Sequence, residues 1–178
     1  MILIHEIQTE RLVLRQWKRE DFKPFREMSL DARVMEYFPS LLNNNESDGI
    51  ASKCQALIDE RGWGFWAVEL KGSGEFIGFI GLHIPTSKLP FIPCIEVGWR
   101  LAYPYWGKGY ATEGAVASLH FGFTNLSIKE IVAFTSVLNT RSENVMKKVG
   151  MKKSGEFGHP DISESHRLHP HVLYSIQR

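Results

Sequence analysis

Apolar and polar positions alternate along several short stretches of the chain, a pattern typical of strands that bury one face. Two of these stretches flank Lys71-Gly72-Ser73-Gly74, whose composition predicts a tight hairpin turn. The last stretches toward the C-terminus are separated by polar segments of varied length. The pattern predicts strands at 11–17, 65–70, 76–83, 94–102, 130–137, 151–157 and 171–177.

Helical spacing of apolar residues occupies most of the remaining chain. Residues 21–37 predict two short helices joined near Ser29-Leu30-Asp31, and the polar segment 40–48 predicts a loop. Ser47 or Asp48 is a suitable cap for a further helix that ends near Arg61. Two more helices are predicted at 109–123 and 140–149, and 85–93 is a proline-rich loop.

Composition narrows the class of protein without indicating its chemistry. The chain has 178 residues, 43% of them hydrophobic and 23% charged, which suits one α+β domain over 1–178. A net charge of +1 gives no footprint for nucleic acid, and no apolar run is long enough for a membrane span. Cys54 and Cys94 match no metal or redox spacing. These features, with no signal-peptide pattern at the start, predict a cytoplasmic protein with no bound metal.

The segment 96–123 reads as a strand, a turn and a helix that opens on Gly107-Lys108-Gly109. The start of a helix leaves four N–H groups unpaired and favours negative charge, and glycines let an anion approach the backbone. A diphosphate is therefore the expected ligand. The dinucleotide fingerprint fails because Thr112 stands where Gly or Ala is needed, and no Walker-type loop occurs. From this segment alone, the alternative interpretation is a glycine-rich turn that binds no ligand.

The stretch Trp106-Gly107-Lys108-Gly109-Tyr110-Ala111 resembles the Gln/Arg-x-x-Gly-x-Gly/Ala pyrophosphate loop of the GNAT acyl-CoA N-acetyltransferases. Further blocks in family order resemble the branch that contains the Rim-type ribosomal-protein N-terminal acetyltransferases. They are Glu10-Arg11-Leu12-Val13-Leu14-Arg15, residues 75–82, residues 95–99, Asn139-Thr140-Arg141-Ser142 with Lys148-Val149-Gly150-Met151, and residues 169–174. The resemblance implies a three-layer arrangement with a mixed, mostly antiparallel, splayed sheet of six to seven strands flanked by helices.

The resemblance also implies an acetyl-CoA site. The backbone of Val97, Gly98 and Trp99 would pair with the pantetheine arm like an added strand. The amides of Gly107, Lys108, Gly109, Tyr110 and Ala111 would bind the pyrophosphate. The other residues expected to contact acetyl-CoA are Trp106, Thr112, Asn139 and Ser142. Lys108 either adds charge to this site or is a solvated loop lysine. Trp106 stands where most relatives have Gln or Arg, a change that leaves the backbone contacts available.

Acetyl transfer needs one group to accept the proton of the amine and another to protonate the leaving thiolate. Many relatives use a Tyr for the second step at the position of Met146, which cannot donate a proton. Ser142 is the substitute that the resemblance offers, with helix capping as its alternative role. Asn139 could cap the helix, contact acetyl-CoA, or both.

Glu96 is the candidate base, because it lies beside the thioester site that the resemblance implies. It shares one face of its strand with Gly98 and Arg100. The alternative for Glu96 is a structural ion pair with that arginine or another. His83 is a second candidate base, with a hydrogen-bonded core histidine as its alternative role.

The acceptor is less clearly indicated. At pH 7.5 roughly a third of an α-amine is neutral against about 0.1% of a lysine side chain, so a site without a strong base favours an α-amine. Acetylation of a small amine and a non-catalytic acyl-CoA-binding protein remain alternatives. Loops 40–48 and 84–93 are expected to line the acceptor site. The histidines of the tail (His159, His166, His169 and His171) predict a cleft wall or core packing rather than a metal site. Relatives often form homodimers, so that state stays open.

Overall fold

A computed structural model describes residues 2–178, and its core is one sheet of eight strands in the order β1-β2-β3-β4-β5-β6-β8-β7. All neighbouring strands run antiparallel except β5 and β6, which are parallel. The strands are β1 (Ile7–Gln8), β2 (Leu12–Arg15), β3 (Phe65–Leu70), β4 (Phe76–His83), β5 (Glu96–Leu101), β6 (Glu130–Ser136), β7 (Lys152–Gly158) and β8 (Pro170–Gln177). The predicted mixed, mostly antiparallel sheet is confirmed. It has eight strands rather than six to seven, because two-residue β1 is too short to leave a pattern.

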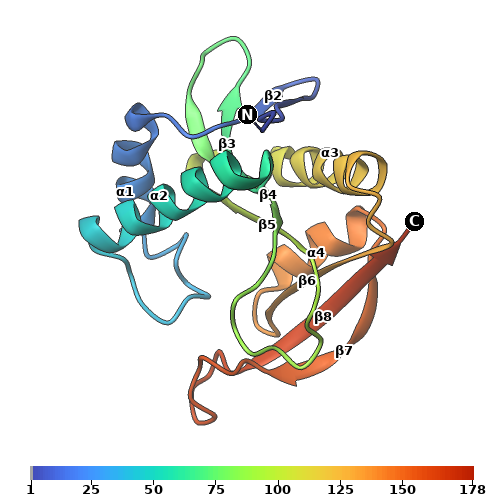
Figure 1. The fold of residues 1–178 in the computed structure, drawn as a ribbon. Helices are drawn as coiled ribbons and strands as arrows, with labels where there is room; N and C mark the ends of the chain where they lie inside the picture. Colours follow the sequence, from blue (N-terminus) through green and yellow to red (C-terminus); the bar gives the residue numbers. More distant parts are fainter. Residues whose placement is uncertain (1) are drawn as a thin grey trace.

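The sheet divides between β5 and β6 (Figure 1). These two strands share one register pair, Glu96 with Val132, whereas β4 pairs with β5 over six residues and β6 with β8 over seven. Beyond Glu96 the strands separate, so the predicted splay is confirmed. We call the opening between β5 and β6 the fork, and Glu96 lies at its apex.

Helices cover both faces of the sheet and complete the predicted three layers. They are α1 (Phe22–Ser29), α2 (Asn44–Arg61), α3 (Tyr110–Asn125) and α4 (Thr140–Lys148). Helix α3 approaches β4 closely, because a Cβ on Gly114 would lie 2.5 Å from the Cδ1 atom of Ile80. Helices α1 and α2 pack together on the opposite face, where Phe25 of α1 contacts Phe79 of β4. Adjacent residues of β4 point to opposite faces, so this strand contacts both helical layers.

The helical region before β3 differs from the prediction in two ways. Helix α1 ends at Ser29, and the second short helix predicted before 37 is replaced by turns. Asp31 accepts a hydrogen bond from the N–H of Arg33 at 2.9 Å, a local side-chain contact that competes with helix formation. The cap of α2 is Asn43 rather than Ser47 or Asp48.

Asn43 caps α2 reciprocally with Glu46. The side chain of Asn43 accepts from the N–H of Glu46 at 3.0 Å, and the carboxylate of Glu46 accepts from the N–H of Asn43 at 2.8 Å. Ser47 is instead buried and bonds to Ser29. Helix α2 therefore begins inside the segment 40–48 that the composition predicts as a loop.

Candidate active site

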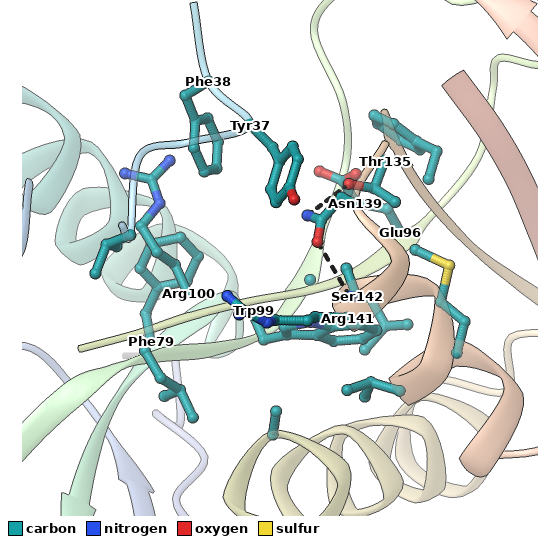
Figure 2. A pocket seen from close by; sticks show the side chains of 18 of the residues that line it. Tyr37, Phe38, Phe79, Glu96, Trp99, Arg100, Thr135, Asn139, Arg141 and Ser142 are labelled. Atoms are coloured by element: carbon teal, nitrogen blue, oxygen red, sulfur yellow. Dashed lines mark hydrogen bonds between the residues drawn. The ribbon is translucent and has the colours of Figure 1, made fainter. Parts of the chain in front are cut away.

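The fork opens into a cavity of about 1180 Å³ that is lined by residues from β5, α3, α4 and the loops near them (Figure 2). The cavity brings together every predicted site residue except Lys108. Those residues are Glu96, Val97, Gly98, Trp99, Trp106, Gly107, Gly109, Tyr110, Ala111, Thr112, Asn139 and Ser142. One continuous space thus joins the glycine loop to the two candidate catalytic side chains.

The edge of β5 that faces the fork has backbone groups free for a ligand. The N–H of Val132 donates to the carbonyl of Ile95 at 2.9 Å, where β5 and β6 are still in contact. Backbone groups point to alternate edges along a strand, so those of Val97 and Trp99 face the same way as the carbonyl of Ile95. The pairing of Glu96 with Val132 also uses the N–H of Val97, so the open groups beyond it are the carbonyl of Val97 and the N–H and carbonyl of Trp99. An extended ligand can therefore add to β5 as another strand would.

The glycine loop before α3 has the backbone conformation that the sequence predicts. Gly107 and Gly109 have φ angles of 73° and 85°, and Gly109 is the residue that precedes the first turn of α3. These left-handed conformations suit glycine and aim successive N–H groups outward at the helix start. The loop therefore presents an anion-binding concavity to the cavity.

The side chain of Trp106 supports the loop from inside. Its indole N–H donates to the carbonyl of Leu101 at 2.7 Å, and the guanidinium of Arg141 lies 5.2 Å from its ring. The indole N–H is therefore used within the protein and is not free for a phosphate. Lys108 is exposed, with its ammonium 5.7 Å from the ring of Tyr105, and it does not line the cavity.

The side chain of Arg11 hydrogen-bonds to the glycine loop and stabilises it, a role that sequence reasoning missed. Its Nη1 donates to the carbonyl of Lys108 at 2.9 Å, and its Nε donates to Glu113 at 2.7 Å. The guanidinium also lies 4.6 Å from the ring of Tyr110. Hydrogen bonds from Thr9 and Arg11 lower the pKa of Glu113 against the opposing effect of burial. Arg11 belongs to a block that carries the family resemblance, which was the available signal.

Glu96 has an unusual environment for a carboxyl group. Burial raises its pKa to about 8, and no hydrogen bond or salt bridge joins its side chain to any residue of 2–178. The alternative ion pair with Arg100 is not formed. Although the two residues share a face of β5, the guanidinium of Arg100 lies over Phe38 and Phe79 instead (Figure 2). A carboxyl with a pKa near neutrality can exchange protons at physiological pH.

His83 lies directly opposite Glu96 in the register of β4 and β5. Its ring stacks on Phe65 with the centroids 5.0 Å apart. Burial, aided by the positive charges of Lys53 and Arg61, lowers the pKa of His83 to about 4. A histidine with so low a pKa is a poor proton acceptor at neutral pH, so Glu96 is the better candidate of the two.

The sequence left open whether Ser142 or Asn139 caps α4, and the structure assigns the cap to Asn139. The side chain of Asn139 accepts from the N–H of Ser142 at 3.2 Å and donates to Thr135 at 3.0 Å (Figure 2). Asn139 is therefore the cap of α4, and Ser142 is not. The hydroxyl of Ser142 lines the cavity and makes no hydrogen bond within residues 2–178. Met146, one turn further along α4, is 1% exposed and packs in the core.

The far wall of the cavity consists of side chains from two loops and from the C-terminal part of the chain. Residues of 85–89 contribute as predicted, but none of 40–48 lines the cavity. The preceding turn supplies Tyr37 and Phe38 instead (Figure 2). Sequence reasoning missed these two residues because the helix it predicted ended at Tyr37 and left Phe38 between that helix and the predicted loop.

Two tail histidines complete this wall and pack among aromatic rings. His159 and His171 have ring centroids 4.9 Å apart, next to Phe134 and Phe157. Burial lowers the pKa of His171 to about 4, so its ring is neutral at physiological pH. Within residues 2–178, no three or more His, Cys, Asp or Glu side chains are grouped to hold a metal ion.

Comparison with known proteins identifies the family. The sequence model for the acetyltransferase (GNAT) domain matches residues 11–152. The chain belongs to the GNAT acetyltransferase family. YnaD of Bacillus subtilis (strain 168), described as an uncharacterized N-acetyltransferase, is 31% identical over 152 residues, which are 85% of each chain.

Solved GNAT structures have the same fold. A GNAT-family acetyltransferase from Bacillus anthracis superposes with a TM-score of 0.80 at 28% identity, over 97% of this chain and 98% of that one. The ribosomal-protein-S5-alanine acetyltransferase from Vibrio fischeri superposes with a TM-score of 0.74 at 19% identity, over 97% and 96% of the two chains. At that identity the second likeness concerns the fold alone.

Membership of the GNAT family identifies the reaction class. The chain is an N-acetyltransferase, and acetyl-CoA is its acyl donor. No helix within residues 2–178 is both long and apolar enough to cross a membrane.

Proposed function

We propose that this GNAT enzyme acetylates a primary α-amine, such as the N-terminus of a peptide or protein, at the apex of the fork. The observation that carries the proposal is the position of Glu96. This unpaired carboxyl has a pKa of about 8 and lies where the open edge of β5 meets the cavity. The thioester of an acetyl-CoA molecule that follows the β5 edge would end beside it.

Acetyl-CoA would bind mainly through backbone groups. Its pantetheine arm would pair with the carbonyl of Val97 and with the backbone of Trp99, beyond the last pair of β5 and β6. Its diphosphate would accept hydrogen bonds from N–H groups of the glycine loop and of the first turn of α3. These are the amides of Gly107, Lys108, Gly109, Tyr110, Ala111 and Thr112. Trp106 would hold the shape of the loop, and Asn139 would hold the start of α4 beside the arm.

Glu96 would act as general base, directly or through one water. The neutral amine attacks the thioester carbonyl, and a C–N bond forms as the carbonyl electrons move onto oxygen. The carboxylate of Glu96 accepts the proton that leaves nitrogen. Its pKa of about 8 makes it a stronger base than an ordinary carboxylate. The tetrahedral intermediate then collapses, and the C–S bond breaks.

Ser142 would assist the departure of CoA. The leaving thiolate has an ordinary thiol pKa of about 8.5, so one hydrogen bond from a neutral hydroxyl is sufficient assistance at neutral pH. The hydroxyl of Ser142 has no partner within residues 2–178, which leaves its O–H free to donate. The proton held by Glu96 can then reach the thiolate or water, and the enzyme returns to its starting state.

The preference for an α-amine follows from pKa values. Glu96 is a weak base compared with a lysine amine of pKa about 10.4, whereas an α-amine has a pKa of about 7.7–8.0. At neutral pH a useful fraction of an α-amine is already unprotonated. The site can therefore use α-amines without a stronger base than the one it has.

The test is CoA release from acetyl-CoA in the presence of three matched acceptors. These are a short peptide with a free N-terminus, the same peptide with its N-terminus blocked and one lysine, and a polyamine. We expect turnover chiefly with the first peptide. Turnover chiefly with the blocked lysine peptide or the polyamine would reject the α-amine assignment, and no turnover with any of them would reject acetyl transfer to amines at this site.

A further inference from the structure

Arg100 lines the cavity beside Phe38 of the far wall, on the same face of β5 as Glu96 and four residues along the strand. Its guanidinium carbon is 4.0 Å from the ring centroid of Phe38 and 5.4 Å from that of Phe79. Phe79 is the register partner of Arg100 on β4. The two rings hold the guanidinium close to the position of Arg100 itself, away from Glu96 at the apex of the fork.

The guanidinium lacks the partners that a buried cation normally has. Its Nε and Nη1 atoms are buried and make no hydrogen bond within residues 2–178. No Asp or Glu of these residues forms a salt bridge with it. The ionisable group that acts on the pKa of Arg100 is Cys54, and burial raises the pKa of that thiol to about 11, so it carries no charge at neutral pH.

A buried guanidinium without an anion is costly, and enzymes keep such groups where a ligand supplies the missing charge. Arg100 remains a cation at physiological pH, because burial lowers its pKa only to about 10. Its planar fork of N–H donors matches a carboxylate better than any other small anion except phosphate. The stacked aromatic rings favour a planar group and keep the fork in one orientation.

We propose that Arg100 binds a carboxylate of the amine acceptor and thereby selects acceptors that carry an acidic group away from the amine. This inference rests on the proposed function, since it places the reacting amine beside Glu96. Arg100 touches the substrate in this account but takes no part in proton transfer. Tyr37 lies between Arg100 and Glu96 in the view of Figure 2 and lines the same cavity.

The spacing of the two residues sets the length of the acceptor. A strand rises about 3.3 Å per residue, so the Cα atoms of Glu96 and Arg100 are about 13 Å apart. The amine and the carboxylate of the acceptor should therefore be separated by roughly 10 Å, the span of about three extended residues. A free α-amino acid is too short, because its amine and carboxylate share one carbon atom. A tripeptide, or a longer peptide with an acidic residue near its third position, has the required reach.

The experiment compares glycine oligomers with their C-terminal amides. Glycine, diglycine, triglycine and tetraglycine and their amides are assayed for kcat/KM at saturating acetyl-CoA, each corrected for the neutral fraction of its amine. We expect triglycine to exceed triglycinamide by about tenfold or more, the range of a charge-assisted hydrogen bond, with little advantage for glycine itself. In Arg100→Gln the acid-to-amide ratio for triglycine should fall to about one.

Arg33→Gln is the matched control, because Arg33 also stacks on an aromatic ring, at 3.9 Å from Tyr103, but is paired with Asp31 and does not line the cavity. It should keep the wild-type ratio. Arg100→Lys keeps the charge without the planar fork and should restore only part of the preference. A thermal melt of each variant shows whether it is folded before the kinetics are compared.

Several outcomes would overturn the proposal. One is an acid-to-amide ratio near one at every length in the wild type, and another is a ratio that survives in Arg100→Gln. If acetyl-CoA binds but no oligomer is acetylated, the proposed function has failed at this site. The anchor is then decided by titrating triglycine and triglycinamide into the CoA-saturated protein. Tighter binding of the acid to the wild type, but not to Arg100→Gln, supports the anchor, and equal binding rejects it.

Discussion

The cavity has an acyl-donor half, formed mainly by backbone groups, and an acceptor half, formed by side chains. The acyl-donor half consists mainly of backbone: the open edge of β5 and the N–H groups that Gly107 and Gly109 aim into the cavity. The acceptor half consists of side chains from segments far apart in the sequence, among them Tyr37, Arg100 and His171. The donor half can therefore be the same in enzymes with different side chains, whereas the acceptor half depends on which side chains are present.

This contrast predicts which substitutions matter in each half. In the donor half most side chains can change, and only residues that set the backbone path should be sensitive. In the acceptor half and at the apex of the fork, single functional groups should determine the rate. The predictions below test that division, beginning with the largest expected effect.

Gly109→Asp should abolish acetyl-CoA binding, with a loss of affinity of at least about 100-fold. An L-residue at a φ of 85° is strained, its Cβ would lie 3.3 Å from Nη2 of Arg11, and its carboxylate would oppose the diphosphate. Isothermal titration with acetyl-CoA measures the effect. Gly72→Asp is the matched control, because Gly72 has a φ of 91° in the β3–β4 turn and a Cβ added there would meet nothing within 4 Å. Micromolar affinity retained by Gly109→Asp would refute the backbone cradle.

The pH dependence of kcat/KM for a peptide acceptor should be steep below the pKa of Glu96. Burial raises this pKa to about 8, so the carboxylate needed as base is lost as the pH falls through 8. The acceptor amine is lost to protonation in the same range. Well below pH 7.5 the rate should fall about 100-fold per pH unit in the wild type and about tenfold per unit in Glu96→Gln. Equal slopes in the two proteins would remove Glu96 from the rate equation.

Ser142→Ala should lower kcat about tenfold, the value of one hydrogen bond to the departing thiolate, and leave the affinity for acetyl-CoA nearly unchanged. Ser142→Thr keeps the hydroxyl and serves as the control. Because Asn139 rather than Ser142 caps α4, Ser142→Ala should also melt at nearly the wild-type temperature. An unchanged kcat would show that Ser142 lines the cavity without a role in catalysis.

Asn139→Ala should have its main effect on stability rather than on chemistry. Loss of the cap of α4 costs about 1 kcal/mol of unfolding free energy, which lowers the Tm of a chain of this size by about 2–4 °C. Asn139→Asp keeps the capping oxygen and should melt close to the wild type. Calorimetry of the three proteins measures the difference. A wild-type Tm for Asn139→Ala would show that the hydrogen bond to Ser142 N–H is not stabilising.

The same contrast explains how much could be predicted from the sequence. Glycines that require positive φ angles leave a local signature, so the loop from Trp106 to Thr112 was predictable as a unit. The alternation of apolar residues predicted seven of the eight strands, and the order of motif blocks supplied the splay. Two-residue β1 was missed because its pairing with β2 comes from tertiary context.

The acceptor half was less predictable because its contacts are non-local. The turns after Asp31 depend on its local hydrogen bonds, which compete with a helical pattern, so Tyr37 was assigned to the end of a helix and Phe38 to the boundary after it. An ion pair with Glu96 was only the alternative role left open for Arg100, and its stacking on Phe38 joins residues 62 positions apart in the chain. No spacing rule in a single sequence reports such a contact.

The central claim is that acetyl transfer takes place at the apex of the fork, with Glu96 as the proton acceptor. The most direct test measures turnover of a peptide acceptor and acetyl-CoA affinity in Glu96→Gln, with Glu20→Gln, an exposed residue outside the cavity, as the control. The account predicts a fall in kcat of about 100-fold or more, the range of general-base catalysis, with an unchanged dissociation constant for acetyl-CoA. Turnover of Glu96→Gln within about threefold of the wild type, less than general-base catalysis contributes, would contradict it.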